Sequence, residues 1–253
     1  MVPQSGRNAR GTPIVNLVQL DPGDDIAAVI SVTDLEEDVD LVFCSRKGLV
    51  KRTRLAEYKN LRSNGMRSYD CAEGDELIAV KRARTEQHVM IVTRKGMCIR
   101  FPGVNEKGEM EVRHMGRIAR GVRGLRLRED DSIAQMLVLE DDTDLLLLTI
   151  TENGFGKRTP LDQYRVQGRG GSGIINIHTG ARNGDVAGSM QVHNDDRVMM
   201  ITDTGRVIKC PVINIRESGR NTKGVTIMRI GDNERIVSVA RVIDADEDEL
   251  GEE

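Results

Sequence analysis

The most suggestive chemical motif in the chain is a glycine-rich stretch made of Gln167, Gly168, Arg169, Gly170, Gly171, Ser172 and Gly173. Its glycines have the G-x-G-x-x-G spacing of loops that hold a dinucleotide pyrophosphate, which must lead from a strand into a helix. Here a β-branched run, Ile-Ile-Asn-Ile, follows Gly173, and a turn signal at 181–185 comes too soon for a full helix. The context therefore argues against a dinucleotide site.

Other residue types that support catalysis or metal binding are dispersed along the chain. The four cysteines form no C-x-x-C pair, and the four histidines lack the spacing of metal ligands. We find neither paired carboxylates beside a glycine-rich loop nor a nucleophile with a partnering base. We therefore expect no cofactor, no metal and no catalysis by this chain alone. With no Trp, three Phe and three Tyr, the composition also argues against base stacking on an aromatic platform.

Charge is distributed unevenly along the 253 residues. The net charge is −3, but residues 244–253 carry seven carboxylates and no cation, so the rest has 37 basic against 33 acidic residues. We expect this acidic tail to be disordered, either as a solubilising segment or as a polyanion mimic that competes for a basic surface. Neither a run of 18 apolar residues nor an apolar signal region is present, so no membrane partner is expected and the expected location is the cytoplasm.

The glycine motif belongs to a repeat of about fifty residues. Four hairpins share a glycine at 48, 96, 154 and 205, each preceded by an apolar run and followed four residues later by a cation. The turns RKG, ENG and DTG between β-rich runs are typical of hairpins. A second shared element carries a glycine at 11, 65, 121, 173 and 224, and a third is a polar turn followed by an apolar strand.

The order of these elements predicts the domain organisation. Four short strands in a unit of about fifty residues are typical of a propeller-like array, so we predict an all-β disc of four-stranded blades. The units are a partial blade at 1–32 and four blades at about 38–83, 87–140, 144–193 and 196–243, numbered unit 1 to unit 5 below. Gly173 is then a structural glycine, where the chain turns or its backbone approaches a neighbour.

The repeats resemble those of the C-terminal domain of DNA gyrase A. The residues that carry the resemblance are the hairpins at 46–58 and 152–164, ARGTPIVNL at 9–17 and GRNTKGVTIMRI at 219–230. The resemblance covers essentially the whole chain. It implies a β-pinwheel whose basic rim binds and bends double-stranded DNA without sequence preference, in support of ATP-dependent negative supercoiling by this topoisomerase. It also implies a nucleoid-associated bacterial protein, with the remainder of gyrase A and with gyrase B for partners in an A2B2 enzyme.

Two departures from the family pattern bear on function. The resemblance places the catalytic tyrosine in a part of gyrase A that this chain lacks, and Tyr58, Tyr69 and Tyr164 are not expected to replace it. The family's box, Q-R-R-G-G-K-G in the first blade, is matched at five positions by the stretch at 167–173, with Gly168 for an arginine and Ser172 for the lysine. The resemblance therefore implies a degenerate box in a later blade, which keeps one of three cations.

Cations that recur at equivalent repeat positions are the candidate phosphate ligands. We predict that the hairpins and the second elements expose them along the rim, although strand alternation leaves open which side chains point outward. Two alternatives remain: the equivalent domain of topoisomerase IV, in its A-type chain, or a propeller that only binds proteins. The candidate DNA-binding residues are Arg10, Lys51, Arg52, Arg100, Arg120, Arg123, Lys157, Arg158, Arg169, Lys209, Arg220 and Lys223.

Overall fold

The structure is a computed structural model that describes residues 26–60, 65–142 and 144–242. Most of the predicted partial blade at 1–32, the tail at 244–253 and Arg10 therefore lie outside the described residues. The described part is built from short strands and a few single-turn 3-10 helices, which confirms the all-β prediction. The strands are β1 (Asp40–Ser45), β2 (Leu49–Arg54), β3 (Leu77–Ala83), β4 (Val89–Thr93), β5 (Met97–Phe101), β6 (Val122–Arg123), β7 (Ile133–Val138), β8 (Leu146–Thr151), β9 (Phe155–Pro160), β10 (Ile174–Ile175), β11 (Val186–Val192), β12 (Arg197–Thr202), β13 (Val207–Pro211), β14 (Val225–Thr226) and β15 (Ile236–Val242), and the helices are η2 (Leu55–Tyr58), η3 (Leu161–Gln163) and η4 (Val212–Asn214).

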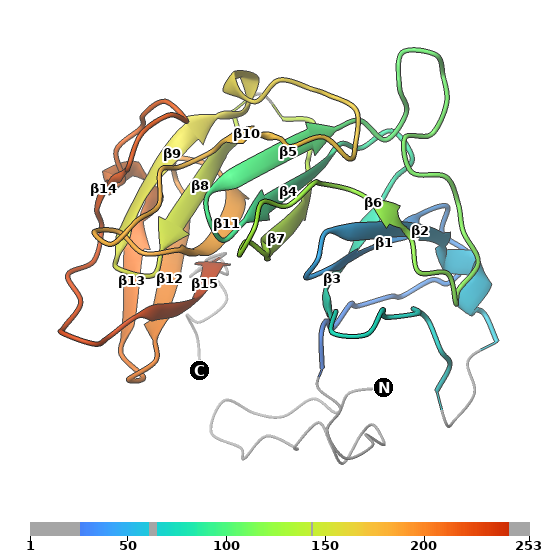
Figure 1. Ribbon diagram of the computed structural model, residues 1–253, viewed down its shortest axis with the longest axis horizontal. Coiled ribbons are helices and arrows are strands. Elements are labelled where there is room, and N and C mark those ends of the chain that lie inside the picture. Colours follow the sequence, from blue (N-terminus) through green and yellow to red (C-terminus); the bar gives the residue numbers. More distant parts are fainter. Residues whose placement is uncertain (1–25, 61–64, 143, 243–253) are drawn as a thin grey trace, which may run out of the picture.

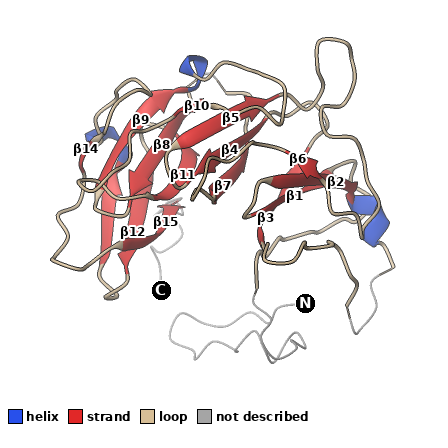
Figure 2. Ribbon diagram, viewed as in Figure 1, coloured by secondary structure: helices blue, strands red, loops and turns tan. Residues whose placement is uncertain are grey.

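The strands form four antiparallel sheets that follow one another around an arc (Figure 1). In each sheet a hairpin of two strands pairs with a strand from the third element of the same unit, as β1 and β2 pair with β3. These third-element strands, β3, β7, β11 and β15, contact one another in sequence along the inside of the arc. The loops connect the sheets around its outside (Figure 2). The arrangement is that of propeller blades.

The fourth strand of three sheets comes from the following unit. β6 of unit 3 pairs with β2, β10 of unit 4 pairs with β5, and β14 of unit 5 pairs with β9. The stretches that cross over, residues 113–126, 165–178 and 216–229, are called exchange segments below. In the last sheet, only three strands, β13, β12 and β15, are present among the described residues. Sequence unit and sheet therefore do not coincide, because each exchange segment completes the sheet before its own.

The hydrophobic core lies between neighbouring sheets. In β4, Val89 and Ile91 pack into a cluster with unit 2, whereas Met90 and Val92 pack into a cluster with unit 4. Successive strand residues point to opposite faces, so a strand covered on both sides needs an unbroken apolar run. This explains the continuous apolar stretches that precede the hairpin turns. Burial between the sheets thus stabilises the array as a whole rather than each unit alone.

The repeat glycines hold the units together by close backbone approach. The exchange-segment glycines Gly121, Gly173 and Gly224 have φ between +70° and +95°. A Cβ atom on Gly173 would lie 2.2 Å from the carbonyl oxygen of Cys98, a contact that only glycine avoids. The prediction that Gly173 is a structural glycine is confirmed. The strand that follows it pairs with β5, so the dinucleotide-loop context is absent.

Candidate nucleic-acid interface

Four of the candidate cations are buried within the seams between units. Lys51 and Arg52 in β2, and Lys157 and Arg158 in β9, are each between 0% and 6% exposed. The prediction that the hairpins expose them is wrong. β2 and β9 would be edge strands in their own units, but the exchange segment of the following unit covers them. A cation that water and DNA cannot reach makes no phosphate contact.

The buried lysines bind main-chain oxygens that surround them. Lys157 Nζ donates hydrogen bonds to the carbonyl oxygens of Gly219 and Arg220, at 2.6 Å each. Lys51 Nζ donates to the carbonyl oxygens of Ser68 and Arg117 and lies 4.3 Å from the centre of the Phe43 ring. Burial lowers the pKa of Lys157 to about 7 and that of Lys51 to about 8. Both lysines therefore join a hairpin to the exchange segment of the next unit.

The arginine four residues after each hairpin glycine also donates hydrogen bonds, which reach the next unit from Arg158 and Arg100 but stay in its own unit and the linker after it for Arg52. Arg158 donates from Nε to the carbonyl oxygen of Ile215 and from NH1 to Asn194 Oδ1. Arg100 is partly buried, and its NH1 donates to the carbonyl oxygen of Leu161, 3.0 Å away in unit 4. Arg52 donates to Asp40 Oδ2 at 3.3 Å and to the Thr85 carbonyl oxygen at 3.1 Å. The repeated cation is thus used inside the protein.

Lys209 occupies the same repeat position but is exposed. It lies in β13, which has no fourth strand beside it among the described residues. Val207 in the same strand is 53% exposed, in contrast to the buried equivalents in β2 and β5. The covering exchange segment, rather than the residue type, therefore decides whether this position is buried.

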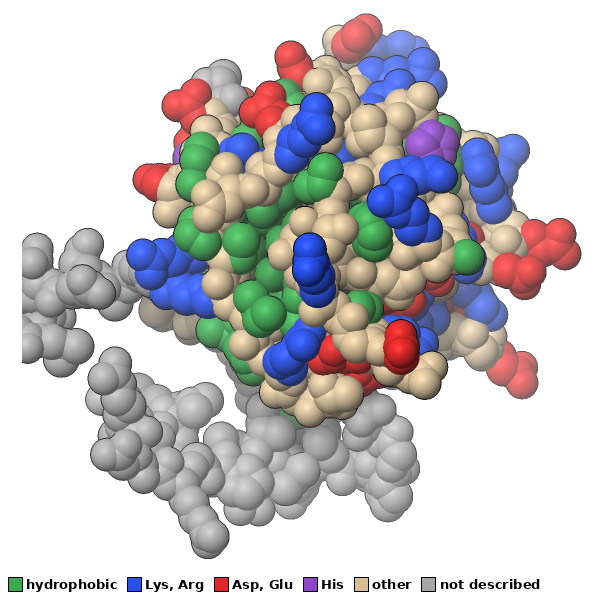
Figure 3. Space-filling view, turned by 90° about the vertical axis from the view of Figure 1, so that its left-hand side faces the viewer, with side chains coloured by type: hydrophobic (Ala, Val, Ile, Leu, Met, Phe, Trp, Pro, Cys, Tyr) green, Lys and Arg blue, Asp and Glu red, His purple; other side chains and the backbone are tan. Residues whose placement is uncertain are grey.

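The exchange segments carry most of the remaining exposed candidates. Arg120, Arg123, Arg169 and Lys223 are exposed, and Arg220 is partly buried, with its NH1 3.0 Å from the carbonyl oxygen of Ile175. Arg120 forms an ion pair with Asp70 at 2.9 Å. Figure 3 shows the side of the molecule where units 4 and 5 lie. Lys and Arg side chains are spread over it with hydrophobic side chains between them, rather than gathered in one patch.

Six further exposed arginines on or beside these segments were not among the predicted site residues. None of them is paired with a carboxylate in the described part of the chain. The signal that could have found them is their position within about eight residues of a repeat glycine, which places them on the chain that crosses the outside of the preceding hairpin. They are Arg113, Arg126, Arg128, Arg165, Arg216 and Arg229.

The degenerate box docks against the preceding unit. The main-chain N–H of Arg169 donates to Glu111 Oε1 at 2.7 Å, and its Nε donates to the Glu111 carbonyl oxygen at 2.7 Å. Its NH1 lies 3.3 Å from the carbonyl oxygen of Arg123. Gly170 N donates to the carbonyl oxygen of Gly124, and Arg126 N donates to that of Gly171. The structure thus brings Arg169, Arg123 and Arg126 together at one seam.

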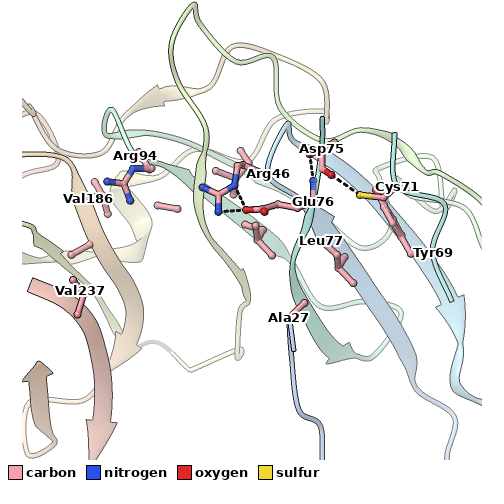
Figure 4. Close-up of a pocket in the computed structure, with 14 residues that line it drawn as sticks. Ala27, Arg46, Tyr69, Cys71, Asp75, Glu76, Leu77, Arg94, Val186 and Val237 are labelled. Atoms are coloured by element: carbon pink, nitrogen blue, oxygen red, sulfur yellow. Dashed lines mark hydrogen bonds and ion pairs between the residues drawn. The ribbon is translucent and has the colours of Figure 1, made fainter. Parts of the chain in front are cut away.

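A pocket of about 960 Å³ opens on the inside of the arc (Figure 4). Among its charged side chains, Arg46 pairs with Glu76 and Arg94 with Asp185 at 3.6 Å, while Asp75 Oδ1 accepts hydrogen bonds from main-chain N–H groups. In the described residues, no cluster of three or more His, Cys, Asp or Glu is arranged to hold a metal ion. The pocket therefore offers no arrangement that we can connect with catalysis.

The described helices include none that is long and apolar enough to cross a membrane.

Comparison with known proteins decides the family. The family described as "DNA gyrase C-terminal domain, beta-propeller" matches residues 1–33, 40–84, 87–140, 146–192 and 196–243. The chain belongs to this family. It is 38% identical over 248 residues to the gyrase A protein of Salmonella typhimurium, a match that covers 98% of this chain and 27% of that protein. A match to gyrase A of Mycolicibacterium smegmatis, at 38% identity over 251 residues, covers 99% of this chain and 29% of that protein.

Solved structures of related domains have the same fold. A C-terminal domain of DNA topoisomerase IV superposes with a TM-score of 0.83 at 24% identity, covering 92% of this chain and 70% of that one. A DNA gyrase A C-terminal domain superposes with a TM-score of 0.80 at 22% identity, covering 92% of this chain and 75% of that one. Because the chain spans less than a third of the gyrase A relatives, it corresponds to their C-terminal domain and not to the whole protein.

Proposed function

We propose that this chain binds double-stranded DNA without sequence preference and bends it around the outside of the arc. The observation that carries the proposal is the set of exposed cations on the exchange segments of a gyrase C-terminal domain. Arg113, Arg123, Arg126, Arg216 and Lys223 are exposed and not ion-paired within the described chain. Because the exchange segments cross the outside of the hairpins of successive units, their cations follow the path that a wrapped duplex would take.

Phosphate contacts are sufficient for such a function. Bending 20–30 bp of duplex by 40–90° costs roughly 1–6 kcal/mol. Contacts between cations and phosphates release condensed counterions and offset that cost, with log K falling by about 0.9 per phosphate for each unit of log salt. Nothing in this mechanism requires base readout, a cofactor or a metal. The buried hairpin cations support it indirectly, because they hold the units in the order that the bent duplex follows.

The role in the cell follows from the family. In this proposal the bent duplex is presented to the remainder of gyrase A and to gyrase B in a cytoplasmic, nucleoid-associated enzyme that introduces negative supercoils with ATP. The chemistry of strand passage lies in those other parts, and this domain supplies only the path of the DNA. The relatives reported above at 38% identity are gyrase A proteins, which favours this assignment over topoisomerase IV.

A salt titration of DNA binding tests the proposal. Replacing Arg123, Arg126 and Lys223 together by Ala should reduce the magnitude of the slope of log K against log salt by about 2.7. The matched control replaces Lys81 and Arg82 on the inner strand β3, together with Arg84 directly after it, by Ala; it removes the same charge and should change the slope much less. Equal effects of the two triple variants would contradict an interface on the exchange segments. Relaxed circular DNA with topoisomerase I then reports whether the bound duplex is wrapped and with which sign.

A further inference from the structure

A small hairpin in unit 3 fixes the position of Glu111. Val104 and Met110 form a β-bridge, and Glu111 N donates to the carbonyl oxygen of Gly103 at 3.0 Å. At the tip, Asn105 Oδ1 accepts hydrogen bonds from the N–H groups of Lys107 and Glu109, at 3.0 Å each. The backbone that carries Glu111 is therefore held by hydrogen bonds on the strand side and at the tip. Its carboxylate is partly buried against unit 4.

That carboxylate is hydrogen-bonded to the main chain of the degenerate box. Glu111 Oε1 accepts the hydrogen bond from the N–H of Arg169 at 2.7 Å. A Cβ atom on Gly168 would lie 3.4 Å from the same oxygen. Such a charge-assisted hydrogen bond from a main-chain N–H to an anionic oxygen is the kind that a glycine-rich loop offers to a phosphate. Glu111 therefore stands where a phosphate oxygen would bind.

The surroundings of this carboxylate are basic. Arg123 and Arg126 flank the stretch that pairs with the loop through Gly124, and both side chains are exposed. Arg169 itself is exposed, although its Nε and NH1 are directed to carbonyl oxygens of unit 3. An anion supplied by the protein thus lies at the loop where the backbone stretches that carry these three arginines meet. The same three arginines would favour an external anion at this position.

We propose that Glu111 is an internal competitor for DNA phosphate at the Gln167–Gly173 loop. It holds the loop closed on unit 3 in the free protein and has to be displaced before a phosphate oxygen can bind to the N–H of Arg169. The inference rests on the proposed function, because it concerns the strength of DNA binding at one seam. It makes this seam a weaker contact point for DNA than its three arginines alone would give.

The test compares two variants that remove one negative charge from the same small hairpin. Glu111→Gln keeps an oxygen that accepts the Arg169 hydrogen bond but removes the negative charge, so the side chain competes less strongly with phosphate. Glu109→Gln changes the net charge by the same amount, and the Glu109 side chain is exposed near the tip of the small hairpin. At low salt, Glu111→Gln should raise the affinity for a short mixed-sequence duplex about three- to tenfold more than Glu109→Gln does. It should also steepen the salt slope by about 0.9, whereas the control should not.

A second substitution ties the effect to the loop. Gly168→Arg places a cation beside Glu111, so with Glu111 present it should pair internally and raise DNA affinity little. In the Glu111→Gln background the same arginine is free for phosphate, and it should steepen the salt slope by a further 0.9 or so. Thermal melting of each variant checks that the seam is intact. Equal gains for Glu111→Gln and Glu109→Gln, or the same gain from Gly168→Arg in both backgrounds, would overturn the inference alone. Absence of DNA binding by the unmodified chain would overturn the proposed function and this inference with it.

Discussion

The contacts at the seams between units predict how much stability two equivalent glycine-to-alanine substitutions lose. Gly154 and Gly205 occupy the same repeat position, with φ of +79° and +83°. A Cβ on Gly154 would lie 2.1 Å from the carbonyl oxygen of Met228 in the exchange segment of unit 5, whereas a Cβ on Gly205 would meet nothing within 4 Å. The stability lost in Gly205→Ala thus measures backbone strain alone. The stability lost in Gly154→Ala measures the same strain together with the disrupted contact at the seam.

The expected losses follow from these contacts. Alanine in the left-handed region costs roughly 1–2 kcal/mol at either site. At Gly154 the exchange segment also has to move away, which disrupts the hydrogen bonds from Ile227 N (2.8 Å) and Met228 N (3.1 Å) to the Gly154 carbonyl oxygen. Each such bond contributes about 0.5–1.5 kcal/mol, so Gly154→Ala should lose about 1–3 kcal/mol more than Gly205→Ala.

Thermal and urea unfolding followed by circular dichroism measures the difference. For a chain of this size, about 1 kcal/mol corresponds to roughly 2–4 °C in the melting temperature. Gly154→Ala should therefore melt at least a few degrees below Gly205→Ala. If both variants lost the same stability, the reasoning would be refuted, because the backbone contact across the seam would then contribute nothing measurable.

Two further predictions concern charge. Burial lowers the pKa of Lys157 from 10.5 to about 7, so between these pH values the unfolded chain binds more protons than the folded chain. The chain should therefore gain stability relative to Lys157→Met as the pH rises from 7 to 10. A difference in urea midpoints that does not change with pH would contradict this expectation. Truncation after Ile243 removes seven carboxylates and should raise the affinity for DNA at low salt, by a factor that decreases as salt screens the contact. Equal DNA binding by the truncated and full chains at about 50 mM salt would contradict the idea that the tail competes with DNA for the basic surface.

The fold could be predicted from the sequence because its local signals agree. The hairpin turns at Gly48, Gly96, Gly154 and Gly205 all have positive φ, and the apolar runs before them form strands. The exchange of the fourth strand could not be predicted, because a repeat shows that equivalent segments exist but not which copy each one pairs with. Only tertiary packing decides that the glycine of one unit lies against the hairpin of the unit before it.

The same limit explains the misplaced cations. Lys157 and Arg158 follow a turn in a strand, and such residues usually point to solvent in an edge strand. The neighbouring β8, which begins with three consecutive leucines, did contain a signal that both faces of this sheet are covered. The exposed Arg123, Arg169 and Lys223 were predicted correctly as surface cations, and their contact with DNA stays a prediction.

Strand exchange also gives the array a direction. Among the described residues, units 2, 3 and 4 each accept a strand from the unit that follows, and units 3, 4 and 5 each donate one to the unit before. The contact between units is therefore heterologous, as in a head-to-tail polymer. Such a contact does not limit the number of units in the array, because each described seam pairs the same two elements of neighbouring units. Closure or pitch of the array must then depend on the small rotation at each seam and on the sequence that differs between units. Duplication or loss of a whole unit would preserve every remaining seam while changing the length of DNA path that the outer surface offers.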